Sequence, residues 1–300
     1  MATDAERKPP SCAWCGAEWD AAARHLPGRT RCGSCGAATT DPWPTAEQLE
    51  RAYASYRPES GRFASAGDAL LRRTRALLGV RVDRIAPPGP VLDVGAGEGS
   101  LLDALEARGR EALGLERRSR REDVRESDIS EVEGEWAAIV FWHTLEHLPA
   151  PGAAFDRACA LLRPGGILLV AAPNDASLQA RAFGDRWFHL DLPRHLVHLP
   201  AAALIARLRS HGLRVTRVSH WRGGQVLFGW LHGMVGKLPG RPDLYEAIRR
   251  PEARSRPMPA PRRAVALAAA VLLFPLAALA SAVEVAARRG GTVYVEARRD

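Results

Sequence analysis

Lysine is almost missing from this 300-residue chain. Lys8 and Lys237 are the only lysines among its 42 basic residues, so arginine supplies nearly all of the positive charge, and the formal net charge is +8. An excess of arginine over lysine often reflects the base composition of the genome and is weak evidence for a nucleic-acid partner. The basic residues also do not alternate with aromatic ones as they do in a nucleic-acid groove. We therefore do not expect nucleic acid as a partner, and a basic surface facing anionic lipid fits the charge at least as well.

The chain also has no apolar leader, because residues 1–10 are polar and charged. A secretory signal peptide requires an apolar core near the N-terminus, and none is expected here. Four of the five cysteines stand in two Cys-x-x-Cys pairs, and Cys159 stands alone. This arrangement is typical of metal binding in a reducing compartment and not of a disulfide framework, so we expect cytoplasmic residence.

The two cysteine pairs are the first motif in the chain. Cys12 and Cys15 are separated from Cys32 and Cys35 by sixteen residues, and a glycine follows each second cysteine. Four thiolates in two tight turns suit a tetrahedral structural Zn²⁺, and the spacing is that of a zinc ribbon. A redox-active pair is the alternative interpretation.

Strands and helices alternate through the middle of the chain. A hydrophobic fraction of 46% is sufficient for a large core, and the alternation predicts an α/β fold with a doubly wound, mostly parallel sheet. The expected strands are Val91–Val94, 111–116, Trp136–Trp142, 167–172, 214–220 and 292–298. The expected helices are 45–85, 100–108, 153–162 and 201–211, and Arg163-Pro164-Gly165-Gly166 is expected as a turn.

Composition shifts divide this chain into four parts. Residues 1–40 form the zinc-ribbon-like module, and residues 41–88 form a helical lead-in or lid that ends at a proline-rich break. Residues 89–224 and 288–300 form the main α/β domain. Residues 225–287 form an apolar helical insertion before the last strand.

A glycine-rich turn follows the first buried strand. The run 93–99 reads Asp-Val-Gly-Ala-Gly-Glu-Gly. Glycines allow a tight turn and a close approach of ligand to main chain, and ligands of open α/β sheets bind at the carboxyl ends of strands. The Gly-x-Gly-x-x-Gly fingerprint of dinucleotide binding is not met, because position 100 is serine. A purely structural turn is the alternative.

Five motifs in order resemble those of class I S-adenosylmethionine-dependent methyltransferases. They are the glycine turn, Glu116 at the end of the next strand, 127–129, the strand Trp136–Trp142 with the His-Thr-Leu-Glu-His segment 143–147 after it, and 162–167. The resemblance implies a Rossmann-like seven-stranded sheet and S-adenosylmethionine as cofactor. It implies cofactor contacts from Asp93, Gly95, Ala96, Gly97, Gly99, Glu116, Asp128, Ile129 and His143, with Glu116 at the ribose hydroxyls and Asp128 and Ile129 at the adenine.

The chain departs from the family pattern at one place. Only eleven residues separate Glu116 from Asp128, so the usual third helix is expected to be short or lost. The histidines after strand four resemble a subgroup with His-x-Leu-Glu-His at that position. Some family members that act on sugars or polyketides carry a similar N-terminal zinc module.

Histidine is the natural base near neutral pH, and methyl transfer to an acceptor needs positioning and, for some acceptors, a base. His143 and His147 follow the strand Trp136–Trp142, and His195 belongs to a second histidine-rich segment at 187–198. We interpret His195 or His147 as the base, with His143 as a further candidate. A packing role for all three is the alternative. The pattern His143-x-x-Glu146-His147 also matches an inverted zinc-protease motif, which would require both histidines on one helix.

Residues 264–283 contain no charge and have the length of a bilayer span. If the segment 292–298 closes the sheet, a single crossing is impossible, and arginines flank both ends. We therefore predict an insertion that rests on, or re-enters, the inner leaflet of the cell membrane. A buried helix or a dimer contact is the alternative.

The sequence thus predicts a methyltransferase acting on a small, lipid-linked or sugar-linked acceptor. A non-catalytic module that keeps the cofactor fold and a zinc-dependent nucleic-acid binder are the alternative functions. The acceptor and the oligomeric state stay open.

Overall fold

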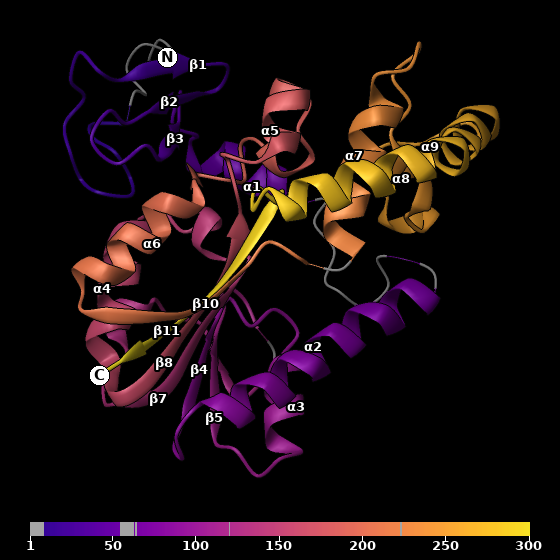
Figure 1. Ribbon diagram of the computed structural model, residues 1–300. Helices are drawn as coiled ribbons and strands as arrows, with labels where there is room; N and C mark the ends of the chain where they lie inside the picture. Colours follow the sequence, from indigo (N-terminus) through magenta and orange to yellow (C-terminus); the bar gives the residue numbers. More distant parts are fainter. Residues whose placement is uncertain (1–8, 55–62, 64, 120, 223) are drawn as a thin grey trace.

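The computed structural model describes residues 9–54, 63, 65–119, 121–222 and 224–300. Within these residues the strands form a seven-stranded sheet and a four-stranded sheet. The large sheet lies in the body of the molecule, and the small sheet lies above it at the N-terminal end of the chain (Figure 1).

The large sheet has the strand order β10-β11-β8-β7-β4-β5-β6. Its strands are β4 (Val91–Val94), β5 (Ala112–Leu115), β6 (Val124–Arg125), β7 (Trp136–Trp142), β8 (Leu162–Pro173), β10 (Leu213–Ser219) and β11 (Thr292–Arg299). The neighbours from β6 to β8 are parallel, whereas β11 runs antiparallel between β8 and β10. This is the predicted doubly wound α/β fold, and the last segment of the chain closes the sheet as expected.

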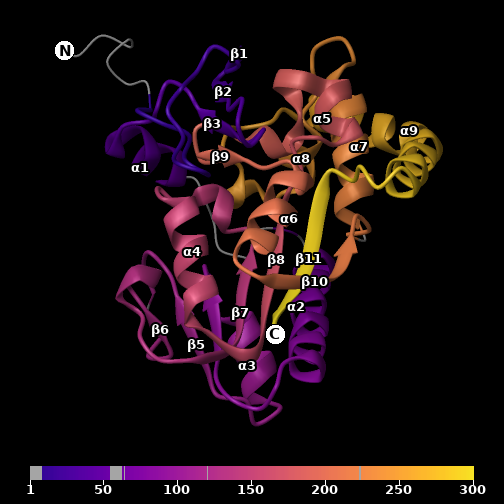
Figure 2. The same cartoon turned by 60° about the vertical axis from the view of Figure 1, so that its left-hand side comes forward.

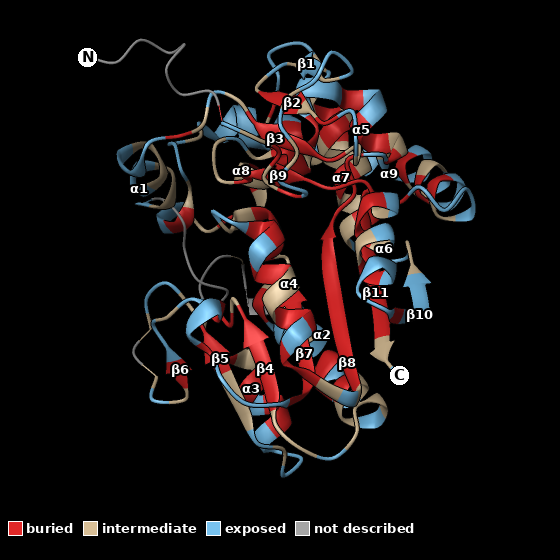
Figure 3. Ribbon diagram, turned by 90° about the vertical axis from the view of Figure 1, so that its left-hand side faces the viewer, coloured by how far each residue is buried: buried red, intermediate tan, exposed pale blue. Residues whose placement is uncertain are grey.

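Helices cover both faces of this sheet, as the alternation of elements predicts. On one face, Leu78 and Val82 of α2 (Ser65–Ile85) pack with Leu101 and Leu105 of α3 (Ser100–Glu106) against the sheet. On the other face, Phe155 of α4 (Pro151–Leu161) and residues of α6 (Ala201–Ser210) form the second part of the core. Strands β7 and β8 are buried along most of their length (Figure 3), because they have neighbours on both sides and helices on both faces.

Two local predictions differ from the structure. The segment 163–166, expected as a turn, lies within the bounds of β8, because Leu162 already pairs with Trp136 and the ladder then shifts register before Ala138. The region 45–85, expected as helical throughout, contains α1 (Ala46–Ala54) and α2, and its residues 55–62 and 64 lie outside the described part.

The expected loss of the third helix is confirmed for the described residues between β5 and β6. Residues 116–119 and 121–123 contain only bends and turns. The side chain of Arg121 stabilises this short connection, because it forms ion pairs of 2.8 Å with Asp103 on α3 and 2.7 Å with Asp123. Of the described arginines in this segment, Arg117 and Arg118 are exposed, and Arg121 binds acidic side chains.

The small sheet consists of β1 (Arg24–Leu26), β2 (Arg29–Arg31), β3 (Ala38–Thr40) and β9 (Val197–His198). Its first three strands come from the cysteine-containing segment, but the fourth comes from the loop that precedes α6. Figure 2 shows β9 beside β3 above the body of the molecule. The N-terminal module therefore shares a sheet with the second histidine-rich segment.

The insertion before β11 is helical, as predicted. It contains α7 (Gly224–Gly236), α8 (Leu244–Ile248) and α9 (Ala260–Ala286), and α5 (Leu178–Phe183) packs beside α7. Among the described residues, α9 is the one helix long and apolar enough to span a membrane, and only 22% of its most apolar window is buried. Near its end, buried Glu284 accepts hydrogen bonds from Gln179 and from Trp230 Nε1 (2.9 Å) and so fixes α9 to α5 and α7.

Candidate functional site

One large cleft opens at the carboxyl ends of the parallel strands. Its volume is about 2870 Å³, several times that of a typical site for a single small ligand. Two groups of residues singled out in the sequence line it together: Gly95, Gly97, Glu116, Asp128 and Ile129 from the first group, and His143, His147 and His195 from the second. The fold therefore brings the glycine turn and the histidines into one site.

The glycine turn has a different requirement at each glycine. Gly95 has φ 82°, and an added Cβ would lie 2.2 Å from Thr144 Oγ1, so this position has no room for a side chain. Gly97 has φ 58°, but no atom lies within 4 Å of the place of a Cβ, so its main chain faces open space in the cleft. Leu115 holds the turn, because its carbonyl accepts the N–H groups of Gly95 (2.8 Å) and Ala96 (3.0 Å).

Glu116 is the acidic residue expected at the ribose. It directly follows β5, and its carboxylate accepts hydrogen bonds from the N–H groups of Gly97 (2.9 Å) and Arg117 (2.8 Å). The carboxylate therefore lies beside the glycine turn, at the edge of the cleft. A carboxylate in this place can accept hydrogen bonds from a pair of vicinal hydroxyls.

The remaining cofactor candidates occupy different depths. Asp93 and Ala96 are buried and do not line the cleft, and Gly99 lies against the Arg121 guanidinium at the start of α3. Asp128 lines the cleft, and its side chain caps a short helical turn by accepting from the Ser130 N–H (2.9 Å), while Ile129 is buried beneath it. Asp93, Ala96 and Gly99 thus support the turn, whereas Asp128 and Ile129 form part of its wall.

His143 follows β7 at the centre of the cleft floor. Its main chain has φ 56°, which is uncommon for a residue with a side chain, and its N–H donates to the Ala171 carbonyl (2.8 Å). Burial, together with the charges of Arg222 and Arg75, lowers the pKa of His143 to about 3. The ring is therefore neutral at physiological pH.

His147 and His195 meet edge to face with their ring centroids 4.6 Å apart. The Nδ1 atom of His147 lies 3.2 Å from the Arg194 carbonyl and 3.0 Å from the Tyr53 hydroxyl, and His195 Nδ1 lies 2.8 Å from the His189 carbonyl. Burial lowers the pKa of His147 to about 4 and also lowers that of His195. Both rings are thus neutral, and each has one nitrogen held by the backbone.

Two residues of this site were not identified as site residues from the sequence. Glu146 is buried between the histidines, and burial raises the pKa of its carboxyl group. Tyr53 reaches His147 from α1, ninety-four positions away in the chain. Glu146 belongs to the His-Thr-Leu-Glu-His segment 143–147, so the sequence contained a signal for it. Tyr53 lies in a helix whose sequence contains no functional pattern.

Aromatic side chains of the insertion form the outer wall of the cleft. Phe228 and His232 of α7 and Tyr245 of α8 line it, and Phe188 contacts all three at ring distances of 5.0–5.3 Å. This wall is aromatic, so it suits a ligand with an apolar or ring-shaped part.

The four cysteines of the N-terminal module cluster as the sequence predicts. Their sulfur atoms lie within 4.8 Å of one another, with Cys12 and Cys35 3.7 Å apart and Cys15 and Cys32 also 3.7 Å apart. The edge of a tetrahedron around Zn²⁺ is about 3.8 Å when each Zn–S bond is about 2.3 Å. The donor set and its spacing therefore fit a four-coordinate zinc ion, whereas a disulfide would bring two sulfurs to about 2.05 Å.

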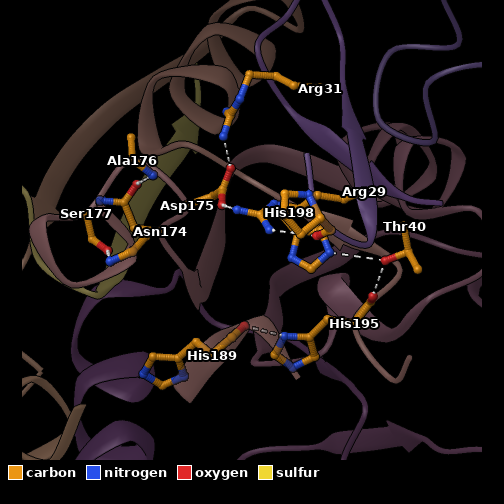
Figure 4. Close-up of polar contacts among 12 residues, drawn as sticks. Arg29, Arg31, Thr40, Asn174, Asp175, Ala176, Ser177, His189, His195 and His198 are labelled. Atoms are coloured by element: carbon orange, nitrogen blue, oxygen red, sulfur yellow. Dashed lines mark hydrogen bonds and ion pairs between the residues drawn. The ribbon is translucent and has the colours of Figure 1, made fainter. Parts of the chain in front are cut away.

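The cysteine module is joined to the cleft through a polar network (Figure 4). Buried Asp175, just past β8, pairs with Arg29 (3.3 Å) and with Arg31, both on β2. Thr40 on β3 donates to the His195 carbonyl (2.6 Å) and contacts His198 Nε2 (3.1 Å). The loop that carries His195 is therefore held by the module and not by the main sheet alone.

The family comparison agrees with this geometry. A family model described as "Methyltransferase domain" matches residues 63–218, which include the glycine turn and all three histidines. No curated protein sequence matches the chain.

Similar solved structures include the 4+2 cyclase SpnF, with 18% identity, a TM-score of 0.50, and coverage of 85% of this chain and 96% of that one. A SAM-dependent methyltransferase from Archaeoglobus fulgidus has 16% identity and a TM-score of 0.43, covering 75% of this chain and 94% of that one. The mycolic acid cyclopropane synthase CmaA1 has 16% identity and a TM-score of 0.45, covering 83% and 93%. The likeness to SpnF shows a shared fold.

Proposed function

The chain belongs to the methyltransferase domain family, and on that premise we propose that it transfers a methyl group from S-adenosylmethionine to a small acceptor. The observation that carries this proposal is the shared cleft: the glycine turn, Glu116 and the histidines line one cavity at the carboxyl ends of β4, β5 and β7. Open α/β sheets bind their ligands at this edge.

The cofactor half of the cleft would be formed by the turn at Gly95 and Gly97, by Glu116 and by Asp128. Gly97 leaves its main chain open to a ligand, and Glu116 lies within hydrogen-bonding distance of the same turn. When bound, S-adenosylmethionine supplies a methyl group on a positively charged sulfur. The task of the chain is then to orient an acceptor atom towards that methyl group and to exclude water.

The acceptor half would be formed by the histidine cluster and the aromatic wall of the insertion. The sequence predicts His195 or His147 as the base, with His143 as a further candidate. His195 is buried, His143 and His147 are partly buried, and all three rings are neutral. A neutral imidazole can accept the proton of an attacking hydroxyl or amine. Phe228 and Tyr245 would pack against the apolar part of the acceptor.

The cysteine cluster would hold a structural zinc ion. Four cysteine ligands leave no open coordination position, so the ion would stabilise the module and take no part in the chemistry. The module would in turn support the loop of His195 through Thr40.

The insertion would bring the enzyme to a membrane, and the acceptor would then be lipid-linked. The exposed residues of α9 include Leu272 (81%), Leu276 (55%) and Leu279 (62%), which follow helical spacing along one face. Arg262 and Arg263 flank this face at one end and Arg288 and Arg289 at the other. Because Glu284 fixes the helix to α5 and α7, a helix lying in the membrane interface fits the structure better than a single span.

The test is incubation of the purified protein with methyl-labelled S-adenosylmethionine and cell extract that has been fractionated into lipid, glycan and small-molecule pools. The proposal predicts label in one pool, together with S-adenosylhomocysteine in equal amount. Cofactor binding without either product in every pool would indicate a non-catalytic binding module, and absence of binding would refute the proposal.

A further inference from the structure

Three side chains at the floor of the cleft form a second group of metal-ligating atoms, separate from the cysteines. Glu146, His147 and His195 each offer one ligand atom, and these atoms lie within 4.8 Å of one another. Glu146 and His147 follow β7, whereas His195 belongs to the loop before β9. The group therefore exists only in the folded chain and lies on the acceptor side of the cleft.

Glu146 is the first observation that indicates a ligand. Its side chain is 3% exposed, and neither carboxylate oxygen accepts a hydrogen bond within the described part of the chain. The nearest cationic partner would be His143, whose Nδ1 lies 3.4 Å from Oε1. A buried carboxylate without hydrogen bonds is costly unless a charged partner joins it, and a cation in the cleft is such a partner.

The orientation of the two histidines is the second observation. A carbonyl oxygen can only accept a hydrogen bond, so His195 Nδ1 donates to the His189 carbonyl (2.8 Å). His147 Nδ1 lies between the Arg194 carbonyl (3.2 Å) and the Tyr53 hydroxyl oxygen (3.0 Å), and its N–H is shared by these two acceptors. In this arrangement both rings have their lone pair on Nε2. Metal-binding histidines are typically held in this way, with one nitrogen donating to a backbone carbonyl and the other on the metal.

We propose that Glu146, His147 and His195 bind a divalent transition-metal cation through one carboxylate and two imidazole nitrogens. This donor set suits Mn²⁺, Fe²⁺ or Zn²⁺, and three protein ligands leave coordination positions for an acceptor oxygen. Asp191 Oδ2 lies 3.8 Å from His195 Nε2 and would balance the charge of the cation from one side.

The cation site differs from the inverted zinc-protease pattern in the sequence. That pattern would pair His143 with His147, but the structure groups His147 with His195, which lies forty-eight positions later, and leaves His143 outside. No helix carries the three ligands together. Zinc-protease chemistry is therefore not what this group of residues indicates.

The inference deepens the proposed function and rests on it for the role of the cation. A divalent cation that contacts an acceptor hydroxyl lowers the pKa of that hydroxyl, so the proton can leave to water without a histidine base. Lone pairs that bind the cation cannot also accept a proton. Cation binding and general-base catalysis by His147 or His195 are therefore separable by experiment.

The test measures Mn²⁺ binding by electron paramagnetic resonance on full-length protein whose cysteine cluster has first been filled with Zn²⁺. The measurement needs no cofactor, so it can fail or succeed independently of methyl transfer. We expect one Mn²⁺ per chain in addition to the zinc. Glu146→Gln keeps the shape of the side chain but should weaken Mn²⁺ binding by at least about 10–100-fold. A loss of this size is typical even when the mutated residue only hydrogen-bonds to a metal ligand.

His211→Asn is the control, because His211 does not line the cleft and binds Asp156 instead (2.7 Å), and this variant should bind Mn²⁺ like the wild type. The cofactor affinity of Glu146→Gln shows whether this variant is folded. If it is not folded, the Mn²⁺ affinity of His195→Gln tests the same site. Wild-type protein that binds no cation beyond the zinc would overturn the proposal. Unchanged Mn²⁺ affinity in folded Glu146→Gln would overturn it equally.

Discussion

The hydroxyl of Thr40 donates a hydrogen bond of 2.6 Å to the backbone carbonyl of His195, although the two residues lie 155 positions apart. The Thr40 N–H also donates to the Leu196 carbonyl (3.0 Å). Thr40 ends the last strand of the cysteine module, and His195 lines the cleft. The module therefore contacts the loop of His195 through the backbone of that loop, and none of the described residues of the module lines the cleft.

Loss of the zinc ion should consequently impair methyl transfer more than cofactor binding. In Cys32→Ser, we expect methyl transfer to fall at least about tenfold, which corresponds to about 1.4 kcal/mol, while cofactor affinity stays unchanged because the glycine turn belongs to the main sheet. Zinc content by mass spectrometry and cofactor affinity by calorimetry measure the two effects. Cys159→Ala is the control, since Cys159 is buried in the main core, away from the cluster, and should retain zinc. An equal loss of methyl transfer and of cofactor affinity in Cys32→Ser would contradict the role of the module in positioning the His195 loop.

Gly97→Val should abolish cofactor binding without unfolding the chain. The strain of a side chain at positive φ costs about 1–2 kcal/mol, and the added atoms would project into the cleft. Gly109→Val is a close control, because Gly109 also has positive φ (70°) and open space around the place of its Cβ but does not line the cleft. The two variants should show similar thermal stability, and only Gly97→Val should lose binding. If both bind the cofactor equally well, the turn does not contact it.

Glu116→Ala should weaken cofactor binding by about 1–3 kcal/mol, the range for a lost hydrogen bond to a charged group. Calorimetry with S-adenosylhomocysteine measures this change directly. Glu106→Ala removes an exposed carboxylate at the end of α3 and should leave the affinity as it is. An affinity in Glu116→Ala equal to that of the wild type would refute the ribose role.

Glu296 should contribute stability that depends on pH. Burial alone would raise the pKa of its carboxyl group, but hydrogen bonds from Arg81 (2.7 and 2.8 Å) and the Tyr294 hydroxyl (2.7 Å) outweigh burial and lower the pKa. A carboxyl group with a lowered folded-state pKa stabilises the fold above its unfolded pKa of about 4.3, and this contribution is lost as the pH falls through the lower folded value.

Glu296→Gln should therefore reduce the free energy of unfolding by about 1–3 kcal/mol at pH 7. The difference between wild type and variant should shrink as the pH falls below about 4. Denaturant titrations at several pH values measure it. A difference that stays constant down to the acid transition would show that the charge of Glu296 is not what stabilises the contact between β11 and α2.

Charges on the outer face of α9 should remove membrane binding. Leu272 is 81% exposed and packs against little else, so Leu272→Glu combined with Leu276→Glu should fold normally but fail to float with vesicles that contain anionic lipid. Val218→Glu is the control, since Val218 is an exposed apolar residue on β10 and not part of α9. Equal flotation of all three proteins would reject the interfacial helix, and a change in oligomeric state would indicate a contact between protein chains instead.

The parts of the fold that depend on local sequence were predictable. A buried strand followed by glycines at positive φ specifies the turn at Gly95 and Gly97, and the Cys-x-x-Cys spacing specifies the cysteine cluster. The last strand, predicted at 292–298, followed from its place after the insertion. The glycine turn and each Cys-x-x-Cys pair lie within a few neighbouring residues, and the last strand follows from the order of elements.

The features that sequence reasoning missed depend on contacts between distant segments. Strand β9 has only two residues, so it shows no periodicity, and its pairing with β3 arises because the cysteine module packs over the loop before α6. Glu146 and His195 approach each other only when the loops after β7 and β8 fold over the same end of the sheet. The proline and glycines at 164–166 indicated a turn, but strand pairing with β7 is present on both sides of them, at Leu162 and at Ile167.

The most direct test of the proposed cofactor site is a crystal structure of the protein soaked with S-adenosylhomocysteine. We predict density for the ligand in the cleft, with the ribose hydroxyls at Glu116 and the main chain of residues 95–99 against the ligand. Ligand density elsewhere on the molecule, or a fully soaked crystal with none in the cleft, would contradict it.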